Sequence, residues 1–268
     1  MKDLRIAAVI CRSQMGQIRH NFNNLVRWVQ LAKGKGAQLI CFPELNLTGY
    51  CTRYDITPAA ISCKDPIVNE IRQLATSLNV VILTGLVEPS RHNENYISHL
   101  VVPPDGKLGV YRKLHMAPPE QGLYSSGENV PVFKAAGITF GIQLCYDAHF
   151  PELSARMTEL GAEVIFFPHA SPRGSAVEKH HSWMRHLPAR AYDNSVFVVA
   201  CNQVGDNCNQ LTFPGNALVI GPSGELIKKS VKGQEGLLLA DLKAEILNKV
   251  RSHPMRHFFP NRRPELYH

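Results

Sequence analysis

The sequence predicts an α/β fold with mixed sheets. Short apolar segments of strand length alternate along the chain with amphipathic segments of helix length, which favours a layered α/β domain. Two strand pairs joined by tight turns rich in Pro and Gly predict antiparallel hairpins within that order, so the sheets are expected to be mixed. No internal repeat, low-complexity segment or Gly/Ser-rich linker divides the 268 residues, and residues 1–268 are interpreted as a single domain.

The first half of the chain predicts five strands and two helices. Apolar side chains occupy every second position from Leu4 to Ile10, which predicts a strand. Apolar residues between 22 and 29 then recur at helical spacing, and two glycines at 34 and 36 end that helix. The elements expected next are a strand at 38–42, a helix at 66–78 behind the N-cap Asp65, a strand at 80–87, and a hairpin of strands 97–102 and 108–111.

The second half continues the alternation. A strand at 138–144 runs directly into Cys145, and a helix is expected at 151–160. The segment 178–194 is helical in composition apart from Pro188. The remaining elements are strands at 164–167 and 196–200, a hairpin of strands 217–220 and 225–228 around Gly-Pro-Ser-Gly, and an apolar segment at 237–240.

Composition limits the classes of function. With 44% hydrophobic and 19% charged residues the chain resembles an ordinary soluble globular protein. The apolar run before Arg12 is too short for a signal peptide, and no run approaches the roughly 20 residues that span a membrane. A cytoplasmic protein with no membrane partner is expected. The formal net charge of +7 allows nucleic-acid binding, but the basic residues are scattered outside the tail from 249 to 263, so no nucleic-acid partner is expected.

Neither the cysteines nor the histidines suggest a metal. The seven cysteines are irregularly spaced and form no CxxC pair, which indicates reduced thiols. Cys11, Cys41 and Cys201 lie in apolar runs and are interpreted as packing residues. His180 and His181 are adjacent, so on a helix they point about 100° apart. No metal and no organic cofactor are expected.

Three short segments place reactive side chains at or just beyond the ends of predicted strands. These are Glu44 after the second strand, Lys113 after the first hairpin, and Cys145. Taken singly, each has an ordinary interpretation: a capping or solvated carboxylate, a solvated surface lysine, and a core cysteine. Together they supply the types of group that cleave an amide by a thiol: a base for the thiol proton, a cation for the tetrahedral oxyanion, and a nucleophile.

The sequences around these residues resemble the nitrilase superfamily of carbon–nitrogen hydrolases, over almost the whole chain. Phe42-Pro43-Glu44 with Thr48-Gly49-Tyr50 resembles the family's glutamate segment, and Tyr111-Arg112-Lys113 with His115 resembles its lysine segment. Cys145-Tyr146-Asp147 with Phe150-Pro151-Glu152 resembles its nucleophile elbow. Further matches follow in the family's order: Trp183, Arg190-Ala191, Asn194, Cys201–Gly205, Gly215, Gly221–Gly224 and Arg262–Tyr267.

The resemblance implies a fold, a site and an assembly. The fold is a four-layer α-β-β-α sandwich, and the subunits pair into a dimer or larger homo-oligomer in which the C-terminal tail 249–268 lies at an interface. Glu44 would be the general base and Cys145 would form a thioester with the acyl group. Lys113 and the backbone N–H of Tyr146 would stabilise the oxyanion.

The family's second glutamate has two candidates in this chain. Glu120 fits best because Gly127 follows it as in the family pattern, whereas Glu128 is the competing choice. In the first case Glu120 would orient Lys113 and the substrate nitrogen.

The resemblance also bears on the substrate. Nitrilases proper carry Trp-Glu after the nucleophile, whereas Tyr146-Asp147 resembles the amidase and carbamoylase branches. A small amide is therefore favoured over a nitrile, with an N-carbamoyl amine as the alternative. Arg173 is hypothesised to hold a substrate carboxylate, which would suit an ω-amido acid; its alternative is a solvated loop residue. The other expected substrate-binding residues are Tyr50, His169 and Ser171.

Two further hypotheses stay open at this point. A catalytically silent interaction protein of the same fold is disfavoured because Glu44, Lys113 and Cys145 are all present. An acyltransferase that passes the thioester to another amine is not separated from a hydrolase by any residue.

Overall fold

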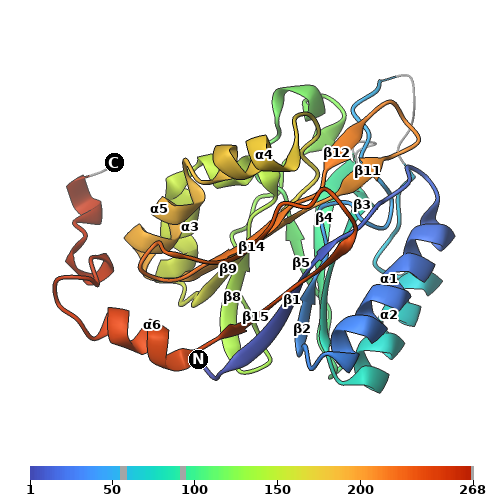
Figure 1. The fold of residues 1–268 in the computed structure, drawn as a ribbon. Helices are drawn as coiled ribbons and strands as arrows, with labels where there is room; N and C mark the ends of the chain where they lie inside the picture. The colour runs from blue at the N-terminus through green and yellow to red at the C-terminus, as the bar shows by residue number, and fades with distance from the viewer. Residues whose placement is uncertain (55–58, 91–94, 267–268) are drawn as a thin grey trace.

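The computed structural model describes residues 1–54, 59–90 and 95–266. Two mixed sheets lie face to face, and helices cover the outer face of each, so the chain forms four layers (Figure 1). The expected four-layer α-β-β-α sandwich is confirmed.

The first sheet carries the N-terminal half of the chain and one late strand. Within the described residues its order is β15-β1-β2-β3-β4-β5, and β6 pairs with β4. β2 is parallel to β1 and β3, whereas β15 and β4 are antiparallel to their neighbours β1 and β3. The strands are β1 (Leu4–Ile10), β2 (Leu39–Cys41), β3 (Val81–Pro89), β4 (Asn95–Val102), β5 (Gly109–Arg112), β6 (Tyr124–Ser125) and β15 (Gly236–Leu242).

The second sheet carries the C-terminal half, in the order β14-β13-β10-β9-β8-β7 among the described residues. β8, β9 and β10 are parallel, so their carboxyl ends meet at one edge. The strands are β7 (Phe133–Ala135), β8 (Ile138–Ile142), β9 (Val164–His169), β10 (Phe197–Asn202), β13 (Ala217–Ile220) and β14 (Leu226–Ser230). A separate ribbon joins β11 (Val204–Asp206) to β12 (Thr212–Pro214).

The helices divide between the two outer faces (Figure 1). α1 (Ile18–Gly34) and α2 (Pro66–Leu78) pack on the first sheet, and Asp65 caps α2 by accepting a hydrogen bond from the Ile67 N–H at 3.0 Å. α3 (Pro151–Glu159), α4 (Ala176–Trp183) and α5 (Leu187–Asn194) lie on the side of the second sheet.

The alternating pattern of β1 explains how the core is divided. Ile6 and Ala8 belong to the apolar cluster between the two sheets, whereas Ala7 and Val9 belong to the cluster beneath α1 and α2. Successive side chains of a strand point to opposite faces, so a strand between a helix layer and a second sheet is apolar on both. Cys11, Cys41 and Cys201 are buried, as expected for packing residues.

The structure differs from the sequence expectations at a few places. The segment 178–194, helical in composition apart from Pro188, is divided between α4 and α5; Pro188 lies in the first turn of α5, which follows a non-helical His186. β8 ends at Ile142, two residues before the expected end. The short strands β6, β7, β11 and β12 and the helix α6 (Ala244–Arg251) were not expected. The tail proposed at 249–268 begins inside α6, and its last two residues lie outside the described ranges.

No helix in the described part of the chain is both long and apolar enough to cross a membrane.

Candidate active site

A fully buried lysine joins two glutamates at the junction of the sheets. Lys113 directly follows β5, and its Nζ lies 2.8 Å from Glu44 Oε1 and 2.8 Å from Glu120 Oε1. The side chains of Lys113 and Glu44 are 0% exposed and that of Glu120 is 1% exposed. We call these three residues the Lys113 cluster. Three charges without water are stable only if they are paired and hydrogen-bonded.

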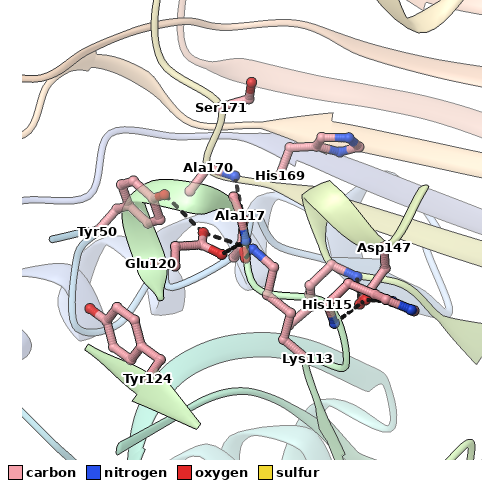
Figure 2. A network of polar contacts seen from close by, with 12 residues as sticks. Tyr50, Lys113, His115, Ala117, Glu120, Tyr124, Asp147, His169, Ala170 and Ser171 are labelled. Atoms are coloured by element: carbon pink, nitrogen blue, oxygen red, sulfur yellow. Dashed lines mark hydrogen bonds and ion pairs between the residues drawn. The ribbon is translucent and has the colours of Figure 1, made fainter. Parts of the chain in front are cut away.

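The remaining oxygens of the Lys113 cluster are also satisfied (Figure 2). Glu44 Oε2 accepts the backbone N–H of Ala170 at 2.9 Å, which ties the first sheet to the loop after β9. Glu120 accepts the Tyr50 hydroxyl at 2.8 Å and the Ala117 N–H at 2.8 Å. These bonds fix the direction of both carboxylates and therefore the position of the ammonium between them.

The Lys113 cluster carries two carboxylates and one cation, and this imbalance shifts its pKa values. Burial raises the pKa of Glu44 to about 7; the charge of Lys113 opposes that rise, and the charge of Glu120 adds to it. Burial alone would lower the pKa of Lys113, but its two glutamate partners outweigh it and raise the pKa. Lys113 is therefore a permanent cation, whereas Glu44 exchanges its proton near neutral pH.

Cys145 lies on the wall of a cavity of about 310 Å³ that also reaches Glu120. It starts a short 3₁₀ helix, Cys145–His149, just after β8, and its φ of 44° is left-handed. A non-glycine residue held in that region is strained, and such strain is typical of nucleophiles on a strand-to-helix elbow. Burial and the Glu44 carboxylate raise the pKa of the thiol, while the charges of Lys113 and Lys179 oppose that rise.

One buried carboxylate joins the cysteine elbow to the lysine segment. Asp147 Oδ2 accepts the Leu144 N–H at 3.0 Å and the Tyr111 hydroxyl at 2.7 Å. Its Oδ1 accepts the His115 N–H at 2.9 Å and lies 2.9 Å from the His115 Nδ1 (Figure 2). Asp147 thus joins Tyr111 and His115, on either side of Lys113, to Leu144, the residue before Cys145. Asp147 is therefore a positioning residue.

The two candidates for the second glutamate lie in different places. Glu120 belongs to the Lys113 cluster, whereas Glu128 is exposed and lines a separate hollow beside Arg112. The contacts of Gly127 explain why a glycine follows Glu120 at this spacing. The Gly127 N–H donates a hydrogen bond to the Lys113 carbonyl at 2.7 Å. A Cβ there would lie 2.6 Å from the Arg112 carbonyl oxygen, so the loop approaches the lysine segment too closely for any side chain.

The expected substrate-binding residues all line the cavity, with different surroundings. Tyr50 is buried and bonded to Glu120. His169 is also buried, and its ring lies 4.4 Å from that of Trp183; burial holds its pKa well below the usual range. The Ser171 hydroxyl accepts the Lys179 ammonium at 2.7 Å, and Arg173 is exposed with a φ of 72°.

Two contributors to this site were not identified from the sequence. Lys179 lines the cavity from α4, yet in the sequence it is one of many scattered basic residues. Asp147 belongs to the nucleophile motif, but the sequence does not predict its structural role. Within the described ranges, no group of three or more His, Cys, Asp or Glu side chains is arranged to hold a metal ion.

Fold and site together define a class of enzyme. A four-layer α/β sandwich with a buried lysine–glutamate cluster beside a cysteine is the arrangement that the resemblance to carbon–nitrogen hydrolases implied.

Comparison with known proteins agrees with that class. A family model described as carbon–nitrogen hydrolase matches residues 5–252. The chain is 28% identical over 270 residues to a probable nitrilase of Schizosaccharomyces pombe, covering 98% of this chain and 96% of the relative. It is 30% identical over 270 residues to an N-carbamoylputrescine amidase of Oryza sativa subsp. japonica, covering 92% and 88%. The chain therefore belongs to the carbon–nitrogen hydrolase family, as its motifs indicated.

Solved structures show the same fold. An amidase from Nesterenkonia sp. superposes with a TM-score of 0.83 at 25% identity, over 98% of this chain and 95% of that one. A protein of Xanthomonas campestris, described as a CN-hydrolase superfamily protein with an arsenic adduct in the active site, superposes with a TM-score of 0.87 at 24% identity, over 98% of each chain.

Proposed function

We propose that this hydrolase cleaves small linear amides through a thioester on Cys145. The observation that carries the proposal is the Lys113 cluster, in which Glu44 and Glu120 hold a permanent cation beside the cavity that Cys145 lines. A fixed cation next to a thiol and a titratable carboxylate is what amide cleavage by a thiol requires.

Acylation follows from these positions. Glu44 takes the thiol proton while the sulfur of Cys145 attacks the carbonyl carbon and the carbonyl oxygen becomes negative. Lys113 and the backbone N–H of Tyr146 stabilise that oxygen. The carbon–nitrogen bond then breaks, and Glu44 passes its proton to the departing nitrogen, which leaves as ammonia or an amine.

Deacylation uses the same base. Glu44 takes a proton from water while the hydroxide attacks the thioester carbon; the carbon–sulfur bond then breaks, the acid is released, and Glu44 returns its proton to the departing sulfur to restore the thiol. Glu120 keeps Lys113 in place throughout, because its Oε1 accepts a hydrogen bond from the same ammonium.

Two features support an amide rather than a nitrile as substrate. The dipeptide after the nucleophile, Tyr146-Asp147, resembles the amidase and carbamoylase branches. The structural neighbour from Nesterenkonia sp. is named an amidase. Relatives named N-carbamoylputrescine amidase support the N-carbamoyl alternative, and relatives named nitrilase support nitrile hydrolysis. An N-carbamoyl amine is the alternative substrate, and nitrile hydrolysis is the next.

A substrate panel tests the proposal. We expect ammonia and free acid in equal amounts from small aliphatic amides, with kcat/KM at least ~10-fold above that for nitriles of the same chain length. The measurement is a coupled ammonia assay with product quantification by chromatography. A preference for nitriles or N-carbamoyl amines would contradict the amide assignment, and acyl transfer to added hydroxylamine without acid formation would indicate an acyltransferase.

The pKa of Glu44 predicts the acid side of the pH profile. The base form of Glu44 is the carboxylate, which is lost as pH falls below about 7, the value to which burial raises this pKa. We therefore expect kcat/KM for a neutral amide to fall about tenfold per pH unit below pH 7 and to level off above it. A profile that is flat between pH 5.5 and 8 would contradict Glu44 as the base. A Glu44→Gln variant should retain little activity and lose this pH dependence.

We also propose that the whole chain acts as one domain and pairs with a second copy. Support for one domain comes from the apolar cluster between the sheets, which includes residues from both halves of the chain. Support for pairing comes from exposed apolar side chains along α5 and the C-terminal segment: Tyr192, Met255, Phe258 and Leu266. The molar mass in solution, measured by light scattering, tests the pairing.

A further inference from the structure

Lys179 is a half-buried cation in the cavity, and no described carboxylate pairs with it. Its Nζ donates to the Ser171 hydroxyl at 2.7 Å and to the Pro172 carbonyl at 3.1 Å, and both acceptors are neutral. An ammonium has three N–H donors, so these two bonds leave one donor for another partner. Burial lowers the pKa of Lys179, and repulsion from Arg173 lowers it further.

The rest of the cavity does not compensate this charge. Among the described lining residues the only carboxylate is Glu120, and it is already bonded to Lys113. Arg173 adds a second cation to the same wall. The pKa values of His149 and His186 are lowered, both chiefly by burial, so these side chains stay neutral at physiological pH and neither add to nor offset the charge of Lys179.

The loop after β9 fixes where this charge lies relative to the reaction. The Ala170 N–H donates a hydrogen bond to Glu44, and the hydroxyl of the next residue, Ser171, accepts one from the Lys179 ammonium. The Ser171 side chain points away from Lys113 (Figure 2). Lys179 and Cys145 line the same cavity of about 310 Å³, so a single small molecule in that cavity can reach both. The charge of Lys179 reaches Cys145, because it opposes the rise in the pKa of that thiol.

We propose that Lys179, assisted by Arg173, binds an anionic group at the end of the substrate remote from the amide. The favoured substrate class is then the monoamide of a small dicarboxylic acid. A carboxylate there would accept a charge-assisted hydrogen bond from Lys179 and would offset the cost of a half-buried, unpaired cation. This inference rests on the proposed amide hydrolysis, since it names which amides the same site selects.

The test compares a charged amide with a neutral one of nearly equal size. Glutaramate, the monoamide of glutaric acid, and glutaramide, its diamide, differ only in a carboxylate against a carboxamide. We expect wild type to prefer glutaramate by at least ~10-fold in kcat/KM. Lys179→Met should reduce kcat/KM for glutaramate about 10- to 100-fold, mostly through KM, and that for glutaramide by less than about threefold. Lys179→Arg should restore most of the preference.

A matched control removes the same charge elsewhere. Lys229 is exposed on β14 and does not line the cavity, so Lys229→Met should leave both substrates as in wild type. Equal losses for both substrates in Lys179→Met would assign Lys179 to holding the Ser171 loop and would overturn the proposal. Absence of any preference for glutaramate in wild type would overturn it as well.

A binding titration separates this proposal from the hydrolysis it rests on. Trp183 lines the cavity, so its fluorescence can report binding of glutaramate and glutaramide to a Cys145→Ala variant that cannot react. Selective binding of glutaramate that is lost in the Cys145→Ala/Lys179→Met double variant supports the anion site even if no amide is hydrolysed. Amide hydrolysis without selective binding of glutaramate would leave the proposed function standing and remove the anion site.

Discussion

Replacing Cys145 with alanine is expected to reduce amide turnover by at least ~10⁴-fold while leaving substrate binding measurable. The sulfur forms the only covalent bond between enzyme and substrate in the proposed reaction, and loss of a nucleophile costs about as much as loss of the whole catalytic unit. Turnover is measured as ammonia release under saturating amide. The Lys113 cluster does not depend on the Cys145 side chain for any hydrogen bond, so the variant should fold normally.

A second thiol gives the control for this experiment. Cys63 is partly buried and lies near Glu88, away from the cavity. Cys63→Ala should keep wild-type turnover. Mass spectrometry of wild type quenched during turnover should detect a protein heavier by one acyl group, and the Cys145→Ala protein should lack that species. Turnover that survives in Cys145→Ala would show that another residue is the nucleophile.

Replacing Lys113 with methionine is expected to remove both activity and stability. The oxyanion loses its cation, which should reduce kcat by at least ~10³-fold. The fold loses the partner of two fully buried carboxylates, and removing one member of a buried ion pair costs about 3–5 kcal/mol of unfolding free energy. Urea denaturation followed by circular dichroism measures the second effect.

The stability loss in Lys113→Met should depend on pH in a defined direction. The pKa of Glu44 is about 7 with Lys113 present, above its ordinary value of 4.5, and Lys113 opposes that rise. Without the lysine this pKa rises further, so the folded state binds more protons than the unfolded state and unfolding free energy falls as pH rises. We expect a larger loss at pH 8 than at pH 5.5. Equal losses at the two pH values would contradict this account, and Lys229→Met provides the control for removal of one charge.

Much of the site was predictable because its residues end strands. Glu44, Lys113 and Cys145 each follow an apolar strand within three residues, and the strand positions are set by local hydrophobic pattern. Their chemical types then suggested one reaction. Glu120 could be preferred over Glu128 because of the glycine at 127, and the reason for that glycine is a close approach between two loops.

The parts that were missed depend on tertiary contacts that no local pattern records. Lys179 becomes special only because the loop after β9 folds back to bring two neutral acceptors to its ammonium. Asp147 becomes a positioning residue because the lysine and cysteine segments, 32 residues apart for His115 and Asp147, come together. The composition of 178–194 sets Pro188 apart, but it does not give the bounds of the two helices on either side of His186.

The origin of the catalytic groups has a consequence for how this enzyme loses activity. Glu44 and Lys113 follow strands of the first sheet, whereas Cys145 and the Ala170 N–H that bonds Glu44 follow strands of the second. Neither sheet by itself carries all three of the groups proposed for catalysis, Glu44, Lys113 and Cys145. Enzymatic activity therefore requires that the two sheets are packed against each other. A partly folded state with only one sheet intact would not hydrolyse the substrate, and its thiol would not cleave amides.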